Sequence, residues 1–244
     1  MGSSEFYDNF ISYQIKSGIN DRIFGLYKRI CRLGVSPNEN ILEIGCGIGT
    51  LTYLLSQKIK KGKIEAVDIS PKSIEHAKRN LQGENTSFQS SDILDFEPEN
   101  LIFDKILLFD VLEHIPEEVH ATIFSKIEKW MDQDSLLLIN LPNPNYILFH
   151  RNNSPENLQE IDNPVYLNKL SQVLDINNLE INYFETYSIW VRNDYQFIIV
   201  KKKNTFVKVE LRLQQSIFRK LILRLKRDLR KVIYKYPKST AVSK

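Results

Sequence analysis

Cysteine, methionine, tryptophan and glycine are all scarce in this chain. Its 244 residues include two cysteines, two methionines, two tryptophans and nine glycines. Two cysteines cannot build a disulfide framework, and no apolar run approaches the roughly 20 residues that a membrane-spanning helix needs. The N-terminus also lacks the pattern of a secretory signal. We therefore expect a cytoplasmic protein rather than a disulfide-rich secreted domain or an integral membrane protein.

Acidic residues are almost absent from the end of the chain. Residues 201–244 carry fifteen Lys and Arg against two acidic residues, a net charge of +13, whereas residues 1–200 have a net charge of −10. Over the whole chain 42% of residues are hydrophobic and 26% charged, the composition of a folded globular protein. We expect an N-terminal helical segment over 1–35, one main domain over 36–203 and a basic amphipathic helical tail over 204–244.

Three of the nine glycines fall within five residues. Gly45, Gly47 and Gly49 follow the apolar run 41–44, which predicts a buried strand, and a helical pattern begins directly after them. Glycine lets the backbone turn sharply there and lets a ligand come within contact distance of main-chain atoms. Cys46 lies inside this turn, where we interpret it as a small filler residue rather than a nucleophile. The turn therefore predicts a ligand-binding site.

The residues around the glycine turn restrict the kind of ligand. Glu43 lies two residues before the first glycine. A carboxylate so close to a phosphate cradle would repel a dinucleotide, but it suits a ligand with an ammonium or sulfonium group. The nicotinamide fingerprint also needs its third glycine at position 50, where this chain has Thr50.

Strands and helices alternate through the main domain. Apolar runs predict strands at 41–44, 63–68, 86–91, 106–109 and 136–141, a helix near 165–174, and a hairpin over 179–190 and 195–201. Helical patterns begin after the glycine turn, after Ser70 and at Pro116. We expect Ser70 to be the N-cap of its helix. This order predicts a doubly wound parallel sheet that ends in an antiparallel hairpin. The polar stretch 143–164 is long for a connection, so we expect a lid or substrate loop.

Acidic residues follow the second and third predicted strands. In a doubly wound sheet the ligand lies across the carboxyl ends of the strands. Asp68 can accept hydrogen bonds from both hydroxyls of a ribose, a role that it would have with either a nicotinamide cofactor or another nucleoside. Asp92 can accept from an adenine amino group, with Ile69 and Ile93 on the two faces of the base. These positions predict a nucleoside site.

The four strand ends together resemble the class I methyltransferases, which bind S-adenosylmethionine. The run Asp-Val-Leu-Glu-His-Ile at 110–115 is similar to a segment of the ubiquinone O-methyltransferase-like enzymes, and the segment after the fifth strand resembles methyltransferases of bacterial polysaccharide pathways. The specific motifs cover residues 38–142, and the pattern continues to about 201. The resemblance implies a Rossmann-like seven-stranded sheet of order 3-2-1-4-5-7-6 with the last strand antiparallel, and S-adenosyl-L-methionine as cofactor. It implies cofactor contacts by Glu43, Gly45, Cys46, Gly47, Gly49, Asp68, Ile69, Ser91, Asp92, Ile93 and Phe109.

Two histidines are candidates for a general base. Methyl transfer from a sulfonium needs no proton for its leaving group, so a base is needed only when the acceptor is a poorly ionised hydroxyl. His114 is the first candidate and His150 its rival; the alternative for His114 is a structural role at the start of a helix. Glu113, Tyr146 and Arg151 are expected on the acceptor side. Glu113, His114 and Glu117 match no strong metal-ligand spacing, so we predict no metal site.

The predicted reaction is O-methylation of a sugar hydroxyl in a surface glycan or its lipid-linked precursor. The alternative acceptor is a small aromatic or quinone-type metabolite, because a fold does not determine a substrate. Two further alternatives lie outside this class: a nucleotide-dependent oxidoreductase, and a non-catalytic protein that binds S-adenosylmethionine.

The tail predicts an amphipathic helix over 205–236. Its apolar stripe consists of Leu213, Ile217, Leu221, Leu225, Leu229 and Val232, and basic residues occupy much of the remaining surface. Such a helix is typical of proteins that bind peripherally to an anionic membrane, here its inner face. The alternatives are docking on the acidic main domain or in a homodimer. Nucleic acid is disfavoured, since aromatic residues interleave poorly with the charges.

Overall fold

The computed structural model divides the chain into two compact units, Met1–Asn204 and Thr205–Lys244. Within them the structure describes residues 4–81, 83–159, 161–204 and 217–234. The predicted N-terminal helical segment lies in the same unit as the predicted main domain.

The first unit contains a seven-stranded sheet of order β3-β2-β1-β4-β5-β7-β6. Neighbouring strands from β3 to β5 pair in parallel, and β7 is antiparallel to both β5 and β6. The strands are β1 (Ile41–Ile44), β2 (Ile64–Asp68), β3 (Thr86–Ser90), β4 (Lys105–Phe109), β5 (Leu136–Pro142), β6 (Leu179–Tyr187) and β7 (Tyr195–Lys202). The predicted strand order and the antiparallel last strand are confirmed.

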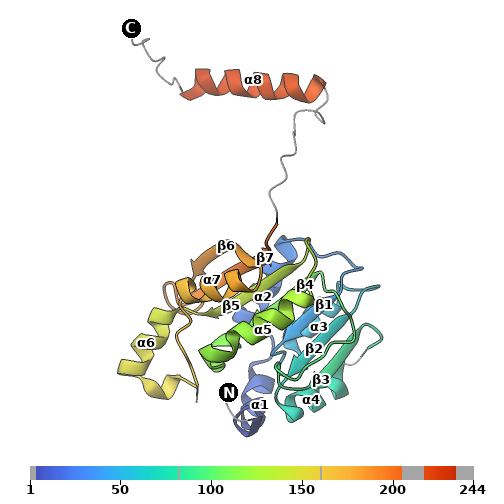
Figure 1. Cartoon of the computed structure of the whole chain (residues 1–244), viewed down its shortest axis with the longest axis vertical. Helices are drawn as coiled ribbons and strands as arrows, with labels where there is room; N and C mark the ends of the chain where they lie inside the picture. Colours follow the sequence, from blue (N-terminus) through green and yellow to red (C-terminus); the bar gives the residue numbers. More distant parts are fainter. Residues whose placement is uncertain (1–3, 82, 160, 205–216, 235–244) are drawn as a thin grey trace. The chain divides into compact units, whose positions relative to one another are not determined.

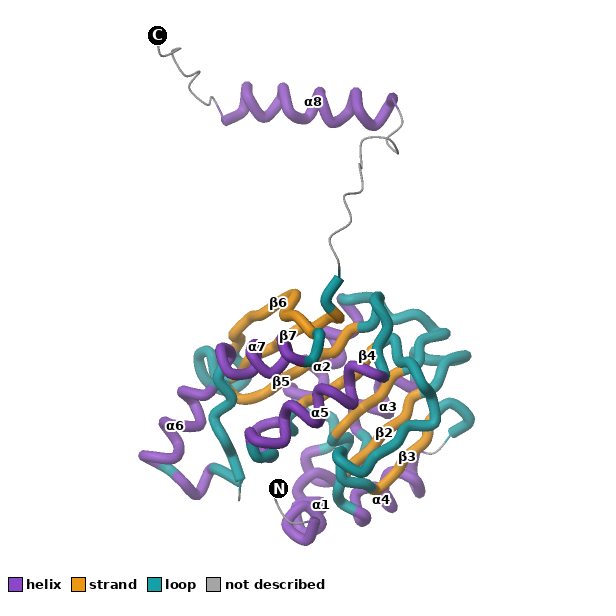
Figure 2. Tube along the Cα trace, viewed as in Figure 1, coloured by secondary structure: helices purple, strands orange, loops and turns teal. Residues whose placement is uncertain are grey.

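Helices cover both faces of this sheet (Figures 1 and 2). On one face the core is completed by α5 (Glu117–Lys129) and α7 (Leu167–Ile176). On the other it is completed by α2 (Asp21–Arg32), α3 (Thr50–Ser56) and α4 (Pro71–Leu81). Every residue of β1 and β4 is buried, as expected of parallel strands that are covered on both faces.

The N-terminal helices are α1 (Ser4–Ser17) and α2. The side chain of Asn20 caps α2, accepting a hydrogen bond of 3.0 Å from the backbone N–H of Ile23. Leu26 and Ile30 of α2 are fully buried and pack with β1 and α3. Helix α2 is therefore part of the main core.

The polar stretch predicted as a loop over 143–164 contains two helices. Helix α6 spans Pro144–Asn153, and the short 3-10 helix η2 spans Pro155–Asn157. The side chain of Asn143 accepts a hydrogen bond from Asn145 N at 2.9 Å, so the stretch begins with a cap followed by proline, a helix start signal.

Smaller differences occur after β4 and β6. The helix predicted from Pro116 begins at Glu117, and a separate 3-10 helix η1 (Leu112–His114) precedes it. Strand β6 ends at Tyr187, so Trp190 lies in the turn of the hairpin rather than in a strand. The predicted cap of α4 is confirmed, because Ser70 Oγ accepts a hydrogen bond of 3.1 Å from Ser73 N.

The second unit contains α8 (Ile217–Tyr234). The remaining parts of the predicted tail helix, 205–216 and 235–236, lie outside the described residues. None of the helices in the described ranges combines the length and the apolar character that crossing a bilayer requires.

We predict that truncating the α2 core contact destabilises the whole first unit. Ile30 is fully buried, so Ile30→Ala should lower the free energy of unfolding by about 2–5 kcal/mol. Leu33, which follows α2 directly, is 39% exposed. Leu33→Ala should change the free energy of unfolding by less than about 0.5 kcal/mol. Denaturant unfolding followed by circular dichroism measures both. Equal effects of the two substitutions would show that α2 is not part of the core.

Candidate functional site

A cavity of about 590 Å³ opens at the carboxyl ends of the parallel strands. It lies where the strand order reverses between β1 and β4, the position at which doubly wound sheets bind ligands. Its walls come from the glycine turn after β1, the residues after β2, β3 and β4, helices α1, α2 and α6, and the β6–β7 hairpin. Residues 156, 158, 159 and 162 complete the wall. Its volume suits a ligand of nucleoside size or larger.

At two positions of the glycine turn there is no room for a side chain. Gly45 has a φ of 78°, and a Cβ atom there would lie 2.3 Å from Val111 Cγ2. Gly49 has a φ of 81°, and its Cβ would lie 2.7 Å from Leu81 Cδ1. Both combine a left-handed backbone with a close approach, so only glycine fits. The turn thereby brings main-chain atoms to the cavity wall.

Ten of the eleven residues expected to contact the cofactor line this cavity. They are Glu43, Gly45, Cys46, Gly47, Asp68, Ile69, Ser91, Asp92, Ile93 and Phe109. Gly49 does not line it and instead begins α3. Burial raises the pKa of the Cys46 thiol, which keeps this side chain protonated and unreactive, in agreement with a filler role.

Main-chain hydrogen bonds orient the two strand-end carboxylates. Asp68 accepts bonds from Gly47 N at 2.7 Å and from Ser70 N at 2.9 Å. Asp92 accepts one from Leu94 N at 2.9 Å. An ionised carboxylate offers about four acceptor positions, so such a group can bind main-chain N–H groups and ligand hydroxyls together. Two oriented carboxylates with the apolar Ile93 in the same wall fit a nucleoside.

Glu43 is a buried acid in the floor of the cavity. Its side chain accepts a hydrogen bond of 2.6 Å from Thr52 Oγ1. Burial raises its pKa to about 7, with a smaller contribution from the Asp68 carboxylate. A cationic group bound nearby would favour the ionised form, so this acid fits a ligand that carries an ammonium or sulfonium group.

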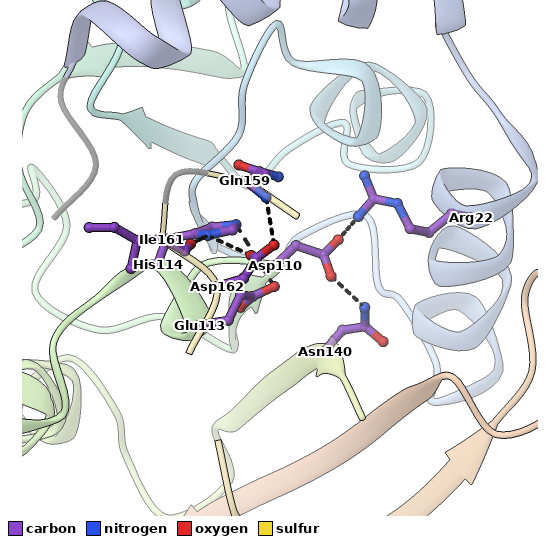
Figure 3. A network of polar contacts seen from close by, with 8 residues as sticks. All are labelled: Arg22, Asp110, Glu113, His114, Asn140, Gln159, Ile161 and Asp162. Carbon is purple, nitrogen blue, oxygen red and sulfur yellow. Dashed lines mark hydrogen bonds and ion pairs between the residues drawn. The ribbon is translucent and has the colours of Figure 1, made fainter. Parts of the chain in front are cut away.

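A second, partly buried network joins α2 to the ends of β4 and β5 (Figure 3). Arg22 forms an ion pair with Asp110, and the other carboxylate oxygen of Asp110 accepts a hydrogen bond of 3.1 Å from Asn140 Nδ2. Asn140 in turn accepts a bond of 2.7 Å from the Tyr187 hydroxyl. Asp110 has a φ of 55°, a left-handed conformation that is uncommon outside glycine and found at functional sites.

His114 lies in the cavity wall with its Nδ1 atom held from one side (Figure 3). Nδ1 is 2.5 Å from the Ile161 carbonyl oxygen and 3.2 Å from Asp162 Oδ1. Both neighbours accept hydrogen bonds, so the ring proton sits on Nδ1 and Nε2 is the basic nitrogen. Burial lowers the pKa of His114, although Ile161 and Asp162 oppose this effect. The ring is therefore neutral at pH 7.

Glu113 is an almost completely buried acid beside this histidine. Burial raises its pKa to about 8, so it is mostly protonated at pH 7. Its Oε1 atom is 4.0 Å from His114 Nε2, and its Oε2 atom is buried without a hydrogen-bond partner. An unsatisfied buried polar atom in a cavity wall is a contact point for a polar ligand.

The other residues predicted near the acceptor do not all lie in the cavity wall. Tyr146 lines the cavity, whereas His150 and Arg151 do not. The His150 ring packs against Tyr146 at a centroid distance of 4.5 Å, and Arg151 donates a hydrogen bond of 2.7 Å to the Asp162 carbonyl oxygen. Glu117, considered with Glu113 and His114 as a metal ligand, pairs with Lys169 at 2.8 Å.

Several cavity residues were not among the predicted ones. They are Tyr13, Gln14, Arg22, Asp110, Asp162, Trp190 and Tyr195. Asp110 belongs to the run that carried the resemblance, so its position could have been found from the sequence. Arg22 and Asp162 come from segments far from every motif, and no spacing connects them to the site.

The fold and the site together define a class I methyltransferase, an enzyme that depends on S-adenosylmethionine. A family model described as "Methyltransferase domain" matches residues 35–208. The chain belongs to this family. An oxidoreductase, the alternative outside this class, is thereby set aside.

Curated relatives match part of the chain. A malonyl-[acyl-carrier protein] O-methyltransferase from Anoxybacillus flavithermus (strain DSM 21510 / WK1) is 41% identical over 91 residues, which are 37% of this chain and 32% of that protein. An (S)-coclaurine N-methyltransferase from Thalictrum flavum subsp. glaucum is 31% identical over 113 residues, 44% of this chain and 30% of that protein. The match spans about a third of the length of these relatives.

Solved structures share the fold over most of the chain. The magnesium protoporphyrin IX methyltransferase from Synechocystis PCC 6803 with bound SAH has a TM-score of 0.62 at 17% identity, covering 80% of this chain and 88% of that chain. A TehB-like SAM-dependent methyltransferase from Corynebacterium glutamicum ATCC 13032 Kitasato has a TM-score of 0.60 at 19% identity, covering 82% and 98%. At these identities the similarity concerns the fold.

We predict that cofactor affinity rises with pH because Glu43 must ionise. The pKa of Glu43 in the empty site is about 7, so its ionised fraction, and with it the affinity for the cationic cofactor, should increase about tenfold from pH 6 to pH 8. Titration calorimetry with S-adenosylmethionine at several pH values measures this. Glu43→Gln should bind more weakly and lose the pH dependence.

Glu65 provides a matched control for this measurement. It is 4% exposed, like Glu43, but accepts hydrogen bonds from Glu99 N and Asn100 N outside the cavity. Glu65→Gln should keep the wild-type pH dependence. An unchanged pH dependence in Glu43→Gln would contradict the assignment.

Proposed function

We propose that this enzyme methylates a hydroxyl oxygen, with His114 as the general base. The observation that carries the proposal is the position of His114 in the cavity wall, with Nδ1 2.5 Å from the Ile161 carbonyl oxygen and 3.2 Å from Asp162 Oδ1. When bound, S-adenosylmethionine supplies an electrophilic methyl group. His114 Nε2 would take the proton of an acceptor hydroxyl whose oxygen receives that methyl group. The arrangement suits a hydroxyl, because an acceptor that ionises poorly gains most from a base.

Asp162 is a positioning residue in this proposal. Its Oδ2 atom accepts a hydrogen bond of 2.8 Å from Gln159 N, which fixes the carboxylate, and its Oδ1 atom faces His114 Nδ1. The Asp162 charge favours the imidazolium that forms when the base takes a proton. Asp162 is 11% exposed, so water screens this interaction little.

For the acceptor we propose a sugar hydroxyl of a surface glycan or of its lipid-linked precursor. Protonated Glu113, Gln159 and Asp162 put several hydrogen-bonding groups in the wall near His114, which suits a polyhydroxylated ring. Among the cavity residues described above Arg22 is the only permanent cation, and it is paired with Asp110. This supports a neutral acceptor over one with a carboxylate at the reacting end. As part of this proposal we include the resemblance of the chain to methyltransferases of polysaccharide pathways and to ubiquinone O-methyltransferase-like enzymes.

A small aromatic or quinone-type acceptor is the second candidate. Trp190 and Tyr195 stand edge to face at 5.6 Å between ring centroids, and both line the cavity together with Tyr146. Aromatic walls bind flat aromatic rings, although they also pack on the apolar faces of sugars. Methyl-labelled S-adenosylmethionine offered with neutral glycosides, catechols and hydroquinones distinguishes the candidates. Label in phenols but in no sugar would favour the second.

We predict that His114→Ala lowers turnover by about 10²–10⁴, because it removes the base. Affinity for S-adenosylhomocysteine should stay within about twofold, since the base acts mainly in the transition state. His150→Ala should keep its turnover, because His150 does not line the cavity. Steady-state kinetics on the labelled acceptor, with calorimetry, measures these effects. Loss of turnover in His150→Ala alone would transfer the role to that residue.

A separate prediction concerns Asp162 and the pH profile. The pKa of His114 lies below its ordinary value, so turnover should persist below pH 6.5 and fall as the ring becomes protonated. Asp162 raises this pKa; Asp162→Asn should therefore shift the acid limb to lower pH while reducing the plateau. A profile that keeps its position in Asp162→Asn would mean that Asp162 has only a structural role.

A further inference from the structure

The described part of α8 has an apolar face and a basic face. At 100° per residue, the side chains of Leu221, Ile222, Leu225, Leu229 and Ile233 fall within an arc of about 120°. All five are exposed, Leu225 to 63% and Ile233 to 60%. A continuous apolar stripe on an exposed helix needs a partner, because a helix is marginally stable alone and gains most of its stability by burying such a face.

Basic side chains occupy the opposite side of the same helix. Lys226 lies about 20° beyond one edge of the apolar arc and Arg224 about 60° beyond the other, with Arg227 and Arg230 between them on the far side. Asp228 is the single acidic residue among the described side chains of α8; it lies about 20° beyond the second edge and is paired with Arg227. Long basic side chains at the edges of an apolar face can extend their charges to a polar boundary while their stems stay in apolar surroundings.

We propose that α8 binds the surface of an anionic membrane and lies parallel to it. The apolar arc would enter the boundary between head groups and acyl chains, while the four basic residues meet anionic head groups. A second copy of α8 fits less well, since pairing two such helices brings like charges together with one acid each to offset them. The strong basicity of the surrounding segment, +13 over residues 201–244, favours the same anionic partner.

This inference extends the proposed function by bringing the enzyme to a lipid-linked acceptor. Binding to vesicles does not require methyl transfer. A failure of the membrane proposal therefore leaves the reaction untouched, and a failure of the proposed acceptor leaves vesicle binding untouched.

Vesicle sedimentation with the full chain tests the proposal. The probes are vesicles of phosphatidylcholine alone and vesicles that also contain phosphatidylglycerol. The wild-type protein should bind the anionic vesicles at least about tenfold more tightly. Binding should weaken as salt rises, since the Debye length falls from about 10 Å at 0.1 M to about 3 Å at 1 M. Binding to neither kind of vesicle, or equally to both, would overturn the proposal.

Leu223 supplies a matched control on the same helix. It is 48% exposed but lies among the basic residues, outside the apolar arc. Leu225→Gln, and more strongly Leu225→Gln with Leu229→Gln, should reduce anionic vesicle binding by about tenfold or more, whereas Leu223→Gln should change it by less than about twofold. Glutamine is chosen because it has nearly the helix propensity of leucine.

Two measurements separate the proposal from its rivals. S-adenosylhomocysteine affinity and thermal unfolding should be the same in all variants, which shows that the first unit remains folded. Sedimentation equilibrium reports self-association without lipid. Equal losses of vesicle binding for Leu223→Gln and Leu225→Gln would overturn the membrane proposal. The proposal would also be overturned if the wild-type protein does not bind vesicles and instead forms a dimer that Leu225→Gln dissociates.

Discussion

The site depends on the adjacency of β1 and β4 in the middle of a parallel sheet. The chain leaves β1 toward α3 on one face and leaves β4 toward α5 on the other. No connection therefore crosses the carboxyl ends of these two strands, and the cavity forms there. The glycine turn, η1 and the residues after β2 and β3 all take their positions from this junction. Helix α2 is joined to the same junction by the ion pair between Arg22 and Asp110.

Exclusion of water determines the charges inside the cavity. In water a glutamate at pH 7 would be a carboxylate. Here burial raises the pKa of Glu113 to about 8 and lowers the pKa of His114 below its ordinary value, so at pH 7 the neighbours are mostly a neutral acid and a neutral base. In the absence of water, ionising both groups costs more free energy than the attraction between the two charges recovers. The pair thus offers a hydrogen-bond donor and a proton acceptor without carrying net charge itself.

The sheet and the cofactor side were readable from the sequence because each signal is local. A glycine turn after an apolar strand and an acid after the next strand reflect contacts within a few residues. The alternation of elements indicated a doubly wound parallel sheet, whereas the strand order was available only from the resemblance to the class I methyltransferases. Asp162 and Arg22 were not readable, because their contacts with His114 and Asp110 join segments far apart in the chain. The helix after Asn143 was overlooked for a different reason: the Asn- and Pro-rich residues around it hid an ordinary cap followed by proline.

The tip of the β6–β7 hairpin is held by its backbone. Asp194, almost fully buried, accepts hydrogen bonds from the backbone N–H groups of Ile189, Trp190 and Val191 at 2.8, 2.9 and 3.1 Å. Every residue except proline has such an N–H group, so these three hydrogen bonds to Asp194 do not depend on the side chains at positions 189–191. Trp190, exposed to 61% at the cavity wall, can thus be exchanged while the turn persists. A replacement at position 190 would therefore change the lining of the cavity while these backbone hydrogen bonds hold the turn in place.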